Sequence, residues 1–121
     1  MSRAIVLFAH GARDPEWARP MQRLAESVRA AEPGVPVFTA FLEFMTPDLP
    51  GAAEQAVQAG ATELIVVPVF LAQGGHVRRD VPVMLARIRE RHAGVRIELR
   101  DALGESQAVI DAMAKVVLGK A

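Results

Sequence analysis

The sequence predicts an α/β fold in which four strand–helix units, in the order βαβαβαβα, form a four-stranded parallel sheet with helices on both faces. Three observations predict it. Short apolar runs of the length of a buried strand recur along the chain. Each run precedes a segment with apolar residues at helical spacing, and the connections between these segments are short. Strands that alternate with helices in this way form parallel sheets.

The first unit combines a buried strand, expected over residues 4–9 (AIVLFA), with the helix that follows it. Asp14 and Pro15 are typical of a helix start, with Asp as the capping residue and Pro at the first helical position. Pro20 lies inside the apolar pattern of this helix, so we expect the helix to be kinked there or to begin after Pro15. The proline–glycine pair at 33–34 ends it.

The second unit begins with a strand expected over residues 35–43, which is rich in Val and Phe. Residues 46–48 (TPD) repeat the cap-then-proline pattern, and the helix that they begin runs to about Ala59 and is closed by Gly60. The apolar face of this helix consists mostly of alanine. We therefore expect it to pack close to the sheet.

The third and fourth units follow the same order. The third strand, expected over residues 63–71 (ELIVVPVFL), is the most hydrophobic segment of the chain. Pro68 inside it cannot donate a backbone hydrogen bond, which predicts an edge position or a local bulge. The regular part of the third helix is expected to begin near Arg79. A strand over residues 95–99 and a helix with apolar residues between 109 and 117 complete the pattern.

Length and composition limit the classes of function. A chain of 121 residues is expected to form a single domain, residues 1–121. It contains no cysteine, which excludes disulfides, thiolate zinc sites and cysteine nucleophiles and fits a reducing compartment. Its 14 basic and 14 acidic residues balance, so the basic surface typical of nucleic-acid binding is absent. The longest apolar run is too short to span a bilayer and no signal peptide is recognisable, so we expect a cytoplasmic protein without membrane partners.

Three side chains that can bind metals fall just after predicted strands. Ligands of open α/β sheets bind beyond the carboxyl ends of the strands. His10 follows the first strand, Glu43 ends the second, and His76 follows the third. Two imidazoles and a carboxylate are a suitable donor set for a divalent first-row metal, and three protein ligands leave coordination positions open for a substrate atom.

Each of these residues also has a structural interpretation. His10 could donate to a backbone carbonyl at the end of its strand, and Glu43 could form an ion pair with a residue such as Arg13. His76 could simply begin a helix. We interpret His92 as structural, because it lies at the end of an arginine-rich helix, where a cation suits the helix dipole.

Arginines lie close to these positions in the sequence. Arg13, Arg78 and Arg79 could form a cationic rim for a substrate with several carboxylates, because the guanidinium group matches a carboxylate with two hydrogen bonds. The alternative is a solvated helix start with Asp80 as partner. Trp17 and several phenylalanines could add apolar walls, although core packing explains most of them. Neither GxGxxG nor GxxxxGK[ST] occurs, so nucleotide binding has no support.

Three segments resemble a known family. HGARD at 10–14, FLEF at 41–44 and VPVFLAQGGHVRRDVP at 67–82 resemble the small CbiX-type class II chelatases, and the similarity extends over nearly the whole chain. Members of this family insert cobalt or iron into sirohydrochlorin, a polycarboxylate tetrapyrrole, during cobalamin or siroheme synthesis. Its short members work as homodimers. The resemblance implies a single chelatase-like domain, with the divalent metal as substrate and no organic cofactor.

The resemblance also implies roles for individual residues. His10, Glu43 and His76 match the metal-binding and catalytic positions, with Glu43 as a ligand or proton acceptor and His10 as a base. The implied substrate-binding residues are Gly11, Arg13, Gln73, Gly74, Gly75, Arg78 and Arg79. The family usually has His-Gly-Ser-Arg where this chain has Ala12, which we expect to alter substrate binding and not the reaction. Such ligands accept cobalt, iron and also nickel.

Two other functions are considered. Histidine phosphatases also have a His-Gly pair after a first strand, but they have an arginine directly before the histidine, where this chain has Ala9. A non-catalytic metal or tetrapyrrole carrier on the same half-size fold would use the same ligands. Turnover above one metal per subunit distinguishes the enzyme from the carrier.

Overall fold

The computed structural model describes residues 2–72 and 74–120, with the side chain of His76 left out. Within these residues the elements follow the predicted order of strands and helices. They are β1 (Arg3–Ala9), the short 3-10 helix η1 (Pro15–Ala18), α1 (Arg19–Ala31), β2 (Val37–Phe41), α2 (Leu49–Gln58), β3 (Glu63–Pro68), α3 (Gly75–Arg91), β4 (Arg96–Leu99), the short 3-10 helix η2 (Leu103–Glu105) and α4 (Gln107–Val117).

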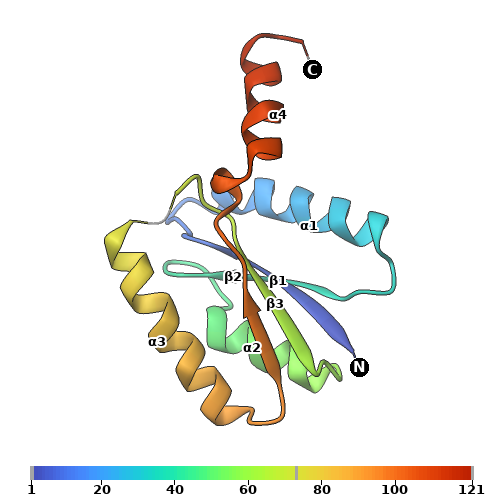
Figure 1. Ribbon diagram of the computed structural model, residues 1–121, viewed down its shortest axis with the longest axis vertical. Coiled ribbons are helices and arrows are strands. Elements are labelled where there is room, and N and C mark those ends of the chain that lie inside the picture. Colours follow the sequence, from blue (N-terminus) through green and yellow to red (C-terminus); the bar gives the residue numbers. More distant parts are fainter. Residues whose placement is uncertain (1, 73, 121) are drawn as a thin grey trace.

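The strands form a four-stranded parallel sheet in the order β2-β1-β3-β4. Helix α1 lies on one face and helices α2 and α3 lie on the other (Figure 1). The predicted α/β class, with a parallel sheet and helices on both faces, is therefore confirmed. Helix α4 differs from the other three, because it extends away from the sheet beyond the carboxyl ends of the strands (Figure 1).

Side chains of β1 alternate between two apolar layers, as the two-residue period of a strand requires. Val6 and Phe8 are fully buried toward α2 and α3, and Leu7 is buried toward α1. Helix α2 presents alanines to the first of these layers, as predicted. Ala52, Ala53 and Ala56 are all buried, and their small side chains let this helix lie close to the sheet.

Pro68 predicted an edge position or a local bulge, and the structure has neither, because β3 is an inner strand whose register with β1 is unbroken from Glu63 to Pro68. Pro68 is its last residue, so the strand is shorter than the predicted 63–71. The N–H of Val69 donates to the carbonyl of Phe8 in β1. Because successive backbone nitrogens of a strand point to opposite neighbours, the nitrogen of Pro68 points toward β4. There the pairing has already ended at Val66 and Leu99, and no ladder hydrogen bond is lost by the missing N–H.

Several element boundaries also differ from the prediction. The first helix begins after Pro15, as expected, at Arg19. Helix α2 is capped by Asp48 and not by Thr46, the first residue of the 46–48 segment. The Asp48 Oδ1 atom accepts a hydrogen bond from the N–H of Gly51 at 2.8 Å. Strand β2 covers only Val37–Phe41 of the expected 35–43.

Helix α3 begins at Gly75, four residues before the predicted Arg79. The apolar face of the helix begins earlier than the prediction allowed. Val77, Val81 and Leu85 are all buried at four-residue spacing, so the first turn packs on the sheet and stays helical despite Pro82. Among the described residues, no helix combines the length and hydropathy that a membrane span needs.

Candidate functional site

The ends of β1 and β2 bring His10 and Glu43 into contact. His10 directly follows β1, and Glu43 lies two residues after β2. The His10 Nε2 and Glu43 Oε1 atoms are 2.8 Å apart. The backbone pairing continues past the strand ends, since the Leu42 N–H donates to the Ala9 carbonyl at 2.9 Å. The Glu43 N–H donates to the His10 carbonyl at 3.0 Å. The extended pairing therefore positions both side chains.

Gly11 allows the two strand ends to approach this closely. Its φ of +90° lies in the region that favours glycine, and a Cβ there would lie 2.1 Å from the Glu43 carbonyl oxygen. On the other segment, Phe44 has a φ of 67°, which is uncommon for a residue with a side chain and turns the chain away after Glu43. The position of Glu43 thus depends on unusual backbone conformations in both segments.

The His10–Glu43 pair has one apolar neighbour and remains accessible to solvent. The side chains are 53% and 48% exposed. The Phe70 ring meets the His10 ring edge-on at 6.5 Å between centroids, and Phe70 itself packs on buried Phe8. An exposed ion pair contributes at most about 1 kcal/mol to stability. The fold therefore gains little from this pair, and its position at the ligand-binding edge of the sheet is better explained by chemistry.

The pair offers two donors that a divalent metal can bind. Two ligand atoms at about 2.1 Å from a metal ion stand roughly 3 Å apart at the octahedral angle of about 90° and roughly 3.4 Å apart at the tetrahedral angle. The 2.8 Å between His10 Nε2 and Glu43 Oε1 is close to the octahedral spacing, so a metal could replace the shared proton with little movement. No cluster of three potential ligands occurs among the described side chains. His76, the predicted third ligand, lies in the first turn of α3, and its side chain is outside the described part.

The predicted arginines lie on opposite flanks of this edge. Arg13 is on the β2 side, where its guanidinium carbon lies 4.7 Å from the centroid of the Phe44 ring. The alternative that paired Glu43 with Arg13 is thus replaced by a Glu43–His10 contact and an Arg13–Phe44 contact. Arg78 is on the β4 side, where it lines a hollow of about 420 Å³ together with residues 99–102 and 105.

The remaining predicted substrate-binding residues surround the N-terminus of α3. Gly74 precedes the helix and Gly75 begins it, and an added Cβ at either position would meet no atom within 4 Å. Both glycines therefore border open space that a flat ligand could approach. Arg79 is exposed on the same helix. Gln73 lies outside the described residues.

Sequence reasoning named Trp17 and several phenylalanines as possible apolar walls but did not place them, and Trp17, Phe41 and Phe70 line an apolar groove beside His10. The groove has a volume of about 690 Å³ and lies between α1 and the ends of β1 and β3. Core packing explains Phe41, which is buried, but Trp17 in this groove is 68% exposed. A signal for this was present, because Trp17 precedes the regular apolar spacing of α1 and lies between Pro15 and Pro20.

His92 lies at the other end of α3, as its C-terminal capping residue. Its Nε2 atom is 3.1 Å from a carboxylate oxygen of Glu54 on α2, and its side chain is mostly buried. This contact joins two helices on the same face of the sheet. The structural interpretation of His92 fits this position.

Comparisons with known proteins all point to one family. The CbiX family model matches residues 4–118. A sirohydrochlorin cobaltochelatase from Methanocaldococcus jannaschii is 40% identical over 89 residues, which are 74% of this chain and 62% of that protein. Further relatives bear the names sirohydrochlorin cobaltochelatase and sirohydrochlorin ferrochelatase. The chain spans 57–62% of the length of the three relatives matched at 38–40% identity.

Solved structures with the same fold include single-length and double-length chains. A cobalamin biosynthesis CbiX protein from Marinobacter aquaeolei VT8 has a TM-score of 0.84 and 33% identity, and the match covers 98% of this chain and 96% of that one. The sirohydrochlorin chelatase SirB from Bacillus subtilis subspecies spizizenii, solved with cobalt, has a TM-score of 0.85 and 27% identity. That match covers 98% of this chain and 51% of the SirB chain.

Proposed function

The chain belongs to the CbiX family, and from this we propose that it is a chelatase that inserts a divalent metal, cobalt or iron, into sirohydrochlorin. Relatives that bear the names of cobaltochelatase and ferrochelatase support this choice of reaction. The observation on this chain that carries the proposal is the exposed His10–Glu43 contact at the carboxyl edge of the sheet. A histidine phosphatase would have an arginine directly before the histidine, where this chain has Ala9.

We assign the binding of the incoming metal to His10, Glu43 and His76. The reaction must hold the ion, remove some of its water ligands and pass it to the ring nitrogens. Neutral imidazole and carboxylate donors bind iron, cobalt and nickel ions, with affinity that rises in that order. Three protein ligands leave open positions, so the substrate nitrogens can enter before the protein ligands leave.

Metal insertion also releases two protons from pyrrole N–H groups, and the His10–Glu43 pair is suited to accept them. Once the ion has moved to the ring, the His10 imidazole is free to take a proton from a pyrrole nitrogen. Glu43 lies 2.8 Å from His10 Nε2 and can stabilise the resulting imidazolium. Because both side chains are about half exposed, the protons can pass on to water.

Substrate binding is assigned to the groups around this pair. Sirohydrochlorin carries carboxylates around its rim, and Arg13 and Arg78 lie on the two flanks of the sheet edge, where carboxylates on different sides of one macrocycle could reach them. Arg79 extends the positive charge along α3. Gly11, Gln73, Gly74 and Gly75 would bring backbone atoms close to the ring. The net charge is zero, so the attraction is local.

The assembly and location are part of the same proposal. We propose that residues 1–121 act as one chelatase-like domain that pairs with a second copy, which would enclose the substrate from both sides. The double length of SirB relative to this chain supports such a pairing. The proposal includes a cytoplasmic location, consistent with the absence of cysteine, and no organic cofactor, nucleic acid or membrane partner.

The test is an anaerobic absorbance assay with purified protein, sirohydrochlorin and excess Co²⁺ or Fe²⁺. We expect a metal-dependent spectral change well above the spontaneous rate, with more than one metal inserted per subunit. His10→Ala should lower the rate about 100-fold or more, because it removes a ligand and a base together. His92→Ala is the matched control, since it makes the same substitution at the far end of α3 and should retain activity.

Two results would contradict the proposal in different ways, and a third would call for a second variant. Wild-type turnover by His10→Ala would remove the assigned site. Binding of sirohydrochlorin without acceleration by any of Co²⁺, Fe²⁺ or Ni²⁺ would favour a carrier. Loss of circular dichroism in His10→Ala would make the activity loss uninformative, in which case His10→Gln, which keeps a polar side chain of similar size, should show the same loss in a folded protein.

A further inference from the structure

Phe44 has a backbone conformation and an exposure that are both unfavourable for its residue type. Among the described residues it is the only one besides glycine with a positive φ, at 67°. The residue is also 55% exposed. Glycine or asparagine would adopt this conformation at lower cost, and a polar side chain would suit the exposure better. Strained residues of this kind cluster at functional sites, so the aromatic ring at position 44 calls for a role.

The ring of Phe44 supports the guanidinium group of Arg13. The Arg13 Cζ atom lies over the ring, 4.7 Å from its centroid, in the arrangement of a cation–π contact. Such a contact uses no oxygen acceptor. It therefore leaves the hydrogen-bonding capacity of the guanidinium N–H groups to a ligand.

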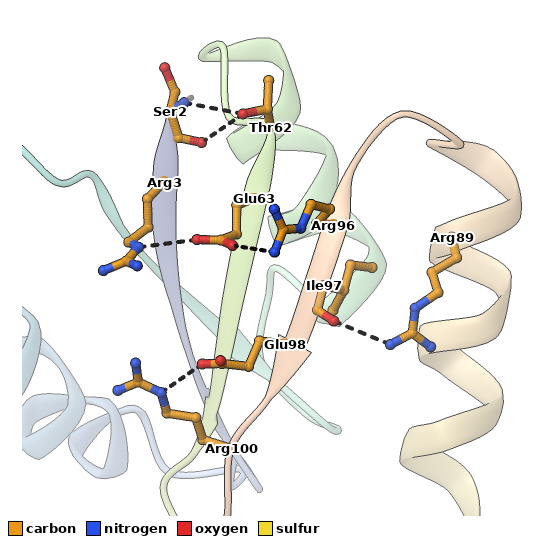
Figure 2. Close-up of polar contacts among 9 residues, drawn as sticks. All are labelled: Ser2, Arg3, Thr62, Glu63, Arg89, Arg96, Ile97, Glu98 and Arg100. Carbon is orange, nitrogen blue, oxygen red and sulfur yellow. Dashed lines mark hydrogen bonds and ion pairs between the residues drawn. The ribbon is translucent and has the colours of Figure 1, made fainter.

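Arginines near β3 and β4 are held differently, by oxygen atoms of the protein. Arg3 and Arg100 each donate from Nε to a glutamate, at 3.1 and 2.9 Å, and Arg89 donates to the Ile97 carbonyl at 3.3 Å (Figure 2). The side chain of Arg13, in contrast, forms no hydrogen bond or ion pair with the described part of the chain. Its positive charge is therefore available to an anionic ligand.

Both members of this contact extend from backbone that is fixed nearby. Arg13 directly precedes Asp14, the capping residue of η1. The loop that carries Phe44 is closed by a hydrogen bond from the Phe41 N–H to the Pro47 carbonyl at 2.9 Å. Because the backbone is fixed on both sides, the ring determines where the long arginine side chain lies.

The Arg13–Phe44 contact borders a hollow between α1 and the end of β2, with a volume of about 470 Å³. Arg13 is the only charged residue among the described residues that line it, and the lining also includes Met21, Gln22, Phe41, Met45 and Thr46. The hollow adjoins the groove beside His10, since Ala12 lines both. An aliphatic arm that ends in a carboxylate fits this lining, because its methylene groups can pack on apolar side chains while the carboxylate reaches the arginine.

We propose that Phe44 is a positioning residue for substrate binding, which holds Arg13 so that it binds the carboxylate of one aliphatic arm of the substrate in this hollow. The inference rests on the proposed function, which supplies a polycarboxylate tetrapyrrole as substrate. Without the ring, the arginine side chain must be immobilised when the substrate binds, which costs affinity. Glu43 depends on the backbone conformation of residue 44 and not on its ring, so metal binding is separate.

Titration of sirohydrochlorin into the protein without metal, followed by the absorbance of the tetrapyrrole, tests the assignment directly. Phe44→Asn removes the ring and keeps a residue that tolerates a positive φ. We expect its Kd to rise about 3- to 10-fold, which is the cost of ordering one long side chain. Phe44→Trp keeps an aromatic face and should bind as the wild type. Wild-type affinity of Phe44→Asn would overturn the proposal.

Circular dichroism checks that these variants fold. Phe44→Asn and Phe44→Gly both relieve the strained conformation, so their thermal midpoints should stay close to that of the wild type. Phe44→Gly carries the same binding expectations and replaces Phe44→Asn if that variant does not fold.

A double-mutant cycle shows whether the ring acts through Arg13. Arg13→Met removes the charge, retains an aliphatic side chain and should raise the Kd about 10-fold or more. Adding Phe44→Asn to it should raise the Kd by less than about 2-fold further, because the ring then has no guanidinium group to hold. Arg23→Met makes the same exchange on the exposed surface of α1 and should bind as the wild type. Losses that simply multiply in the double variant would overturn the proposal.

Cobalt affinity and turnover separate this inference from the proposed function. Phe44→Asn should bind Co²⁺ as the wild type does by calorimetry, and should raise KM while leaving kcat unchanged. A lower Co²⁺ affinity with unchanged sirohydrochlorin affinity would assign the ring to Glu43 and overturn the proposal. If the expected Kd values are found but no metal ion is inserted, the inference stands and the proposed function fails. If Phe44→Asn inserts metal with an unchanged KM, the function stands and the inference is wrong.

Discussion

Replacement of Gly11 by alanine is the sharpest test of how the chain builds the His10–Glu43 contact. An added Cβ would lie 2.1 Å from the Glu43 carbonyl oxygen, far inside van der Waals contact. The residue would also have to keep a φ near +90°. To relieve the clash, the ends of β1 and β2 must separate.

The expected loss of stability follows from these two effects. A residue with a Cβ in a left-handed conformation costs about 1–2 kcal/mol. Separation of the strand ends breaks the hydrogen bond from the Glu43 N–H to the His10 carbonyl, which contributes about 1 kcal/mol. Gly11→Ala should therefore lower the free energy of unfolding by about 2–3 kcal/mol. It should also weaken cobalt binding, because Glu43 is displaced from His10.

Urea unfolding followed by circular dichroism measures the change in the free energy of unfolding. Gly34→Ala and Gly94→Ala are the controls, because an added Cβ meets no atom within 4 Å at either position. They should lie within about 0.5 kcal/mol of the wild type or be slightly more stable. A Gly11→Ala protein as stable as these controls, with unchanged cobalt affinity, would refute the reasoning.

Three further predictions concern packing, capping and the site. Ala53→Leu, at a fully packed position of α2, should lower the free energy of unfolding in urea by about 1–3 kcal/mol. Gln55→Leu on the exposed side of the same helix should change it little, and equal effects of the two variants would contradict the close helix–sheet packing. Asp48→Ala removes the carboxylate that accepts from the Gly51 N–H and should cost about 1 kcal/mol; an unchanged thermal midpoint would show that this cap contributes nothing. Ala12→Ser should change KM for sirohydrochlorin more than kcat in the absorbance assay, because Ala12 lines the hollows beside the site; a change confined to kcat would place it in the chemistry.

The sequence predicted a strand or helix correctly where its apolar pattern alone determines which side of it is buried. The apolar run before His10 is a buried strand, and the alanine-rich face of α2 is buried against the sheet. Two of the errors of position arose where the deciding contact is distant. Pro68 is tolerated in an inner strand because β4 ends before reaching it, and α3 begins early because Val77 is already buried.

The candidate site shows the same division. That His10, Glu43 and His76 follow strands is visible in the sequence, and a parallel sheet collects such residues at one edge. Which of them touch depends on the strand order. Strand β1 lies beside β2, so the pairing past their ends brings Glu43 to His10, and Arg13 contacts Phe44 and not Glu43. The roles of these residues stay predictions.

The sequence by itself determined the α/β class, the order of strands and helices, and the residues available for metal chemistry, because these depend on short-range periodicity and residue type. The tertiary structure decided three other features: the central place of β3, the 2.8 Å contact between His10 and Glu43, and the separation of α4 from the sheet. Each depends on which surfaces meet across long stretches of chain. The helical spacing of the apolar residues in α4 is visible in the sequence, but the separation of this helix from the sheet depends on which surfaces the rest of the fold leaves open to it.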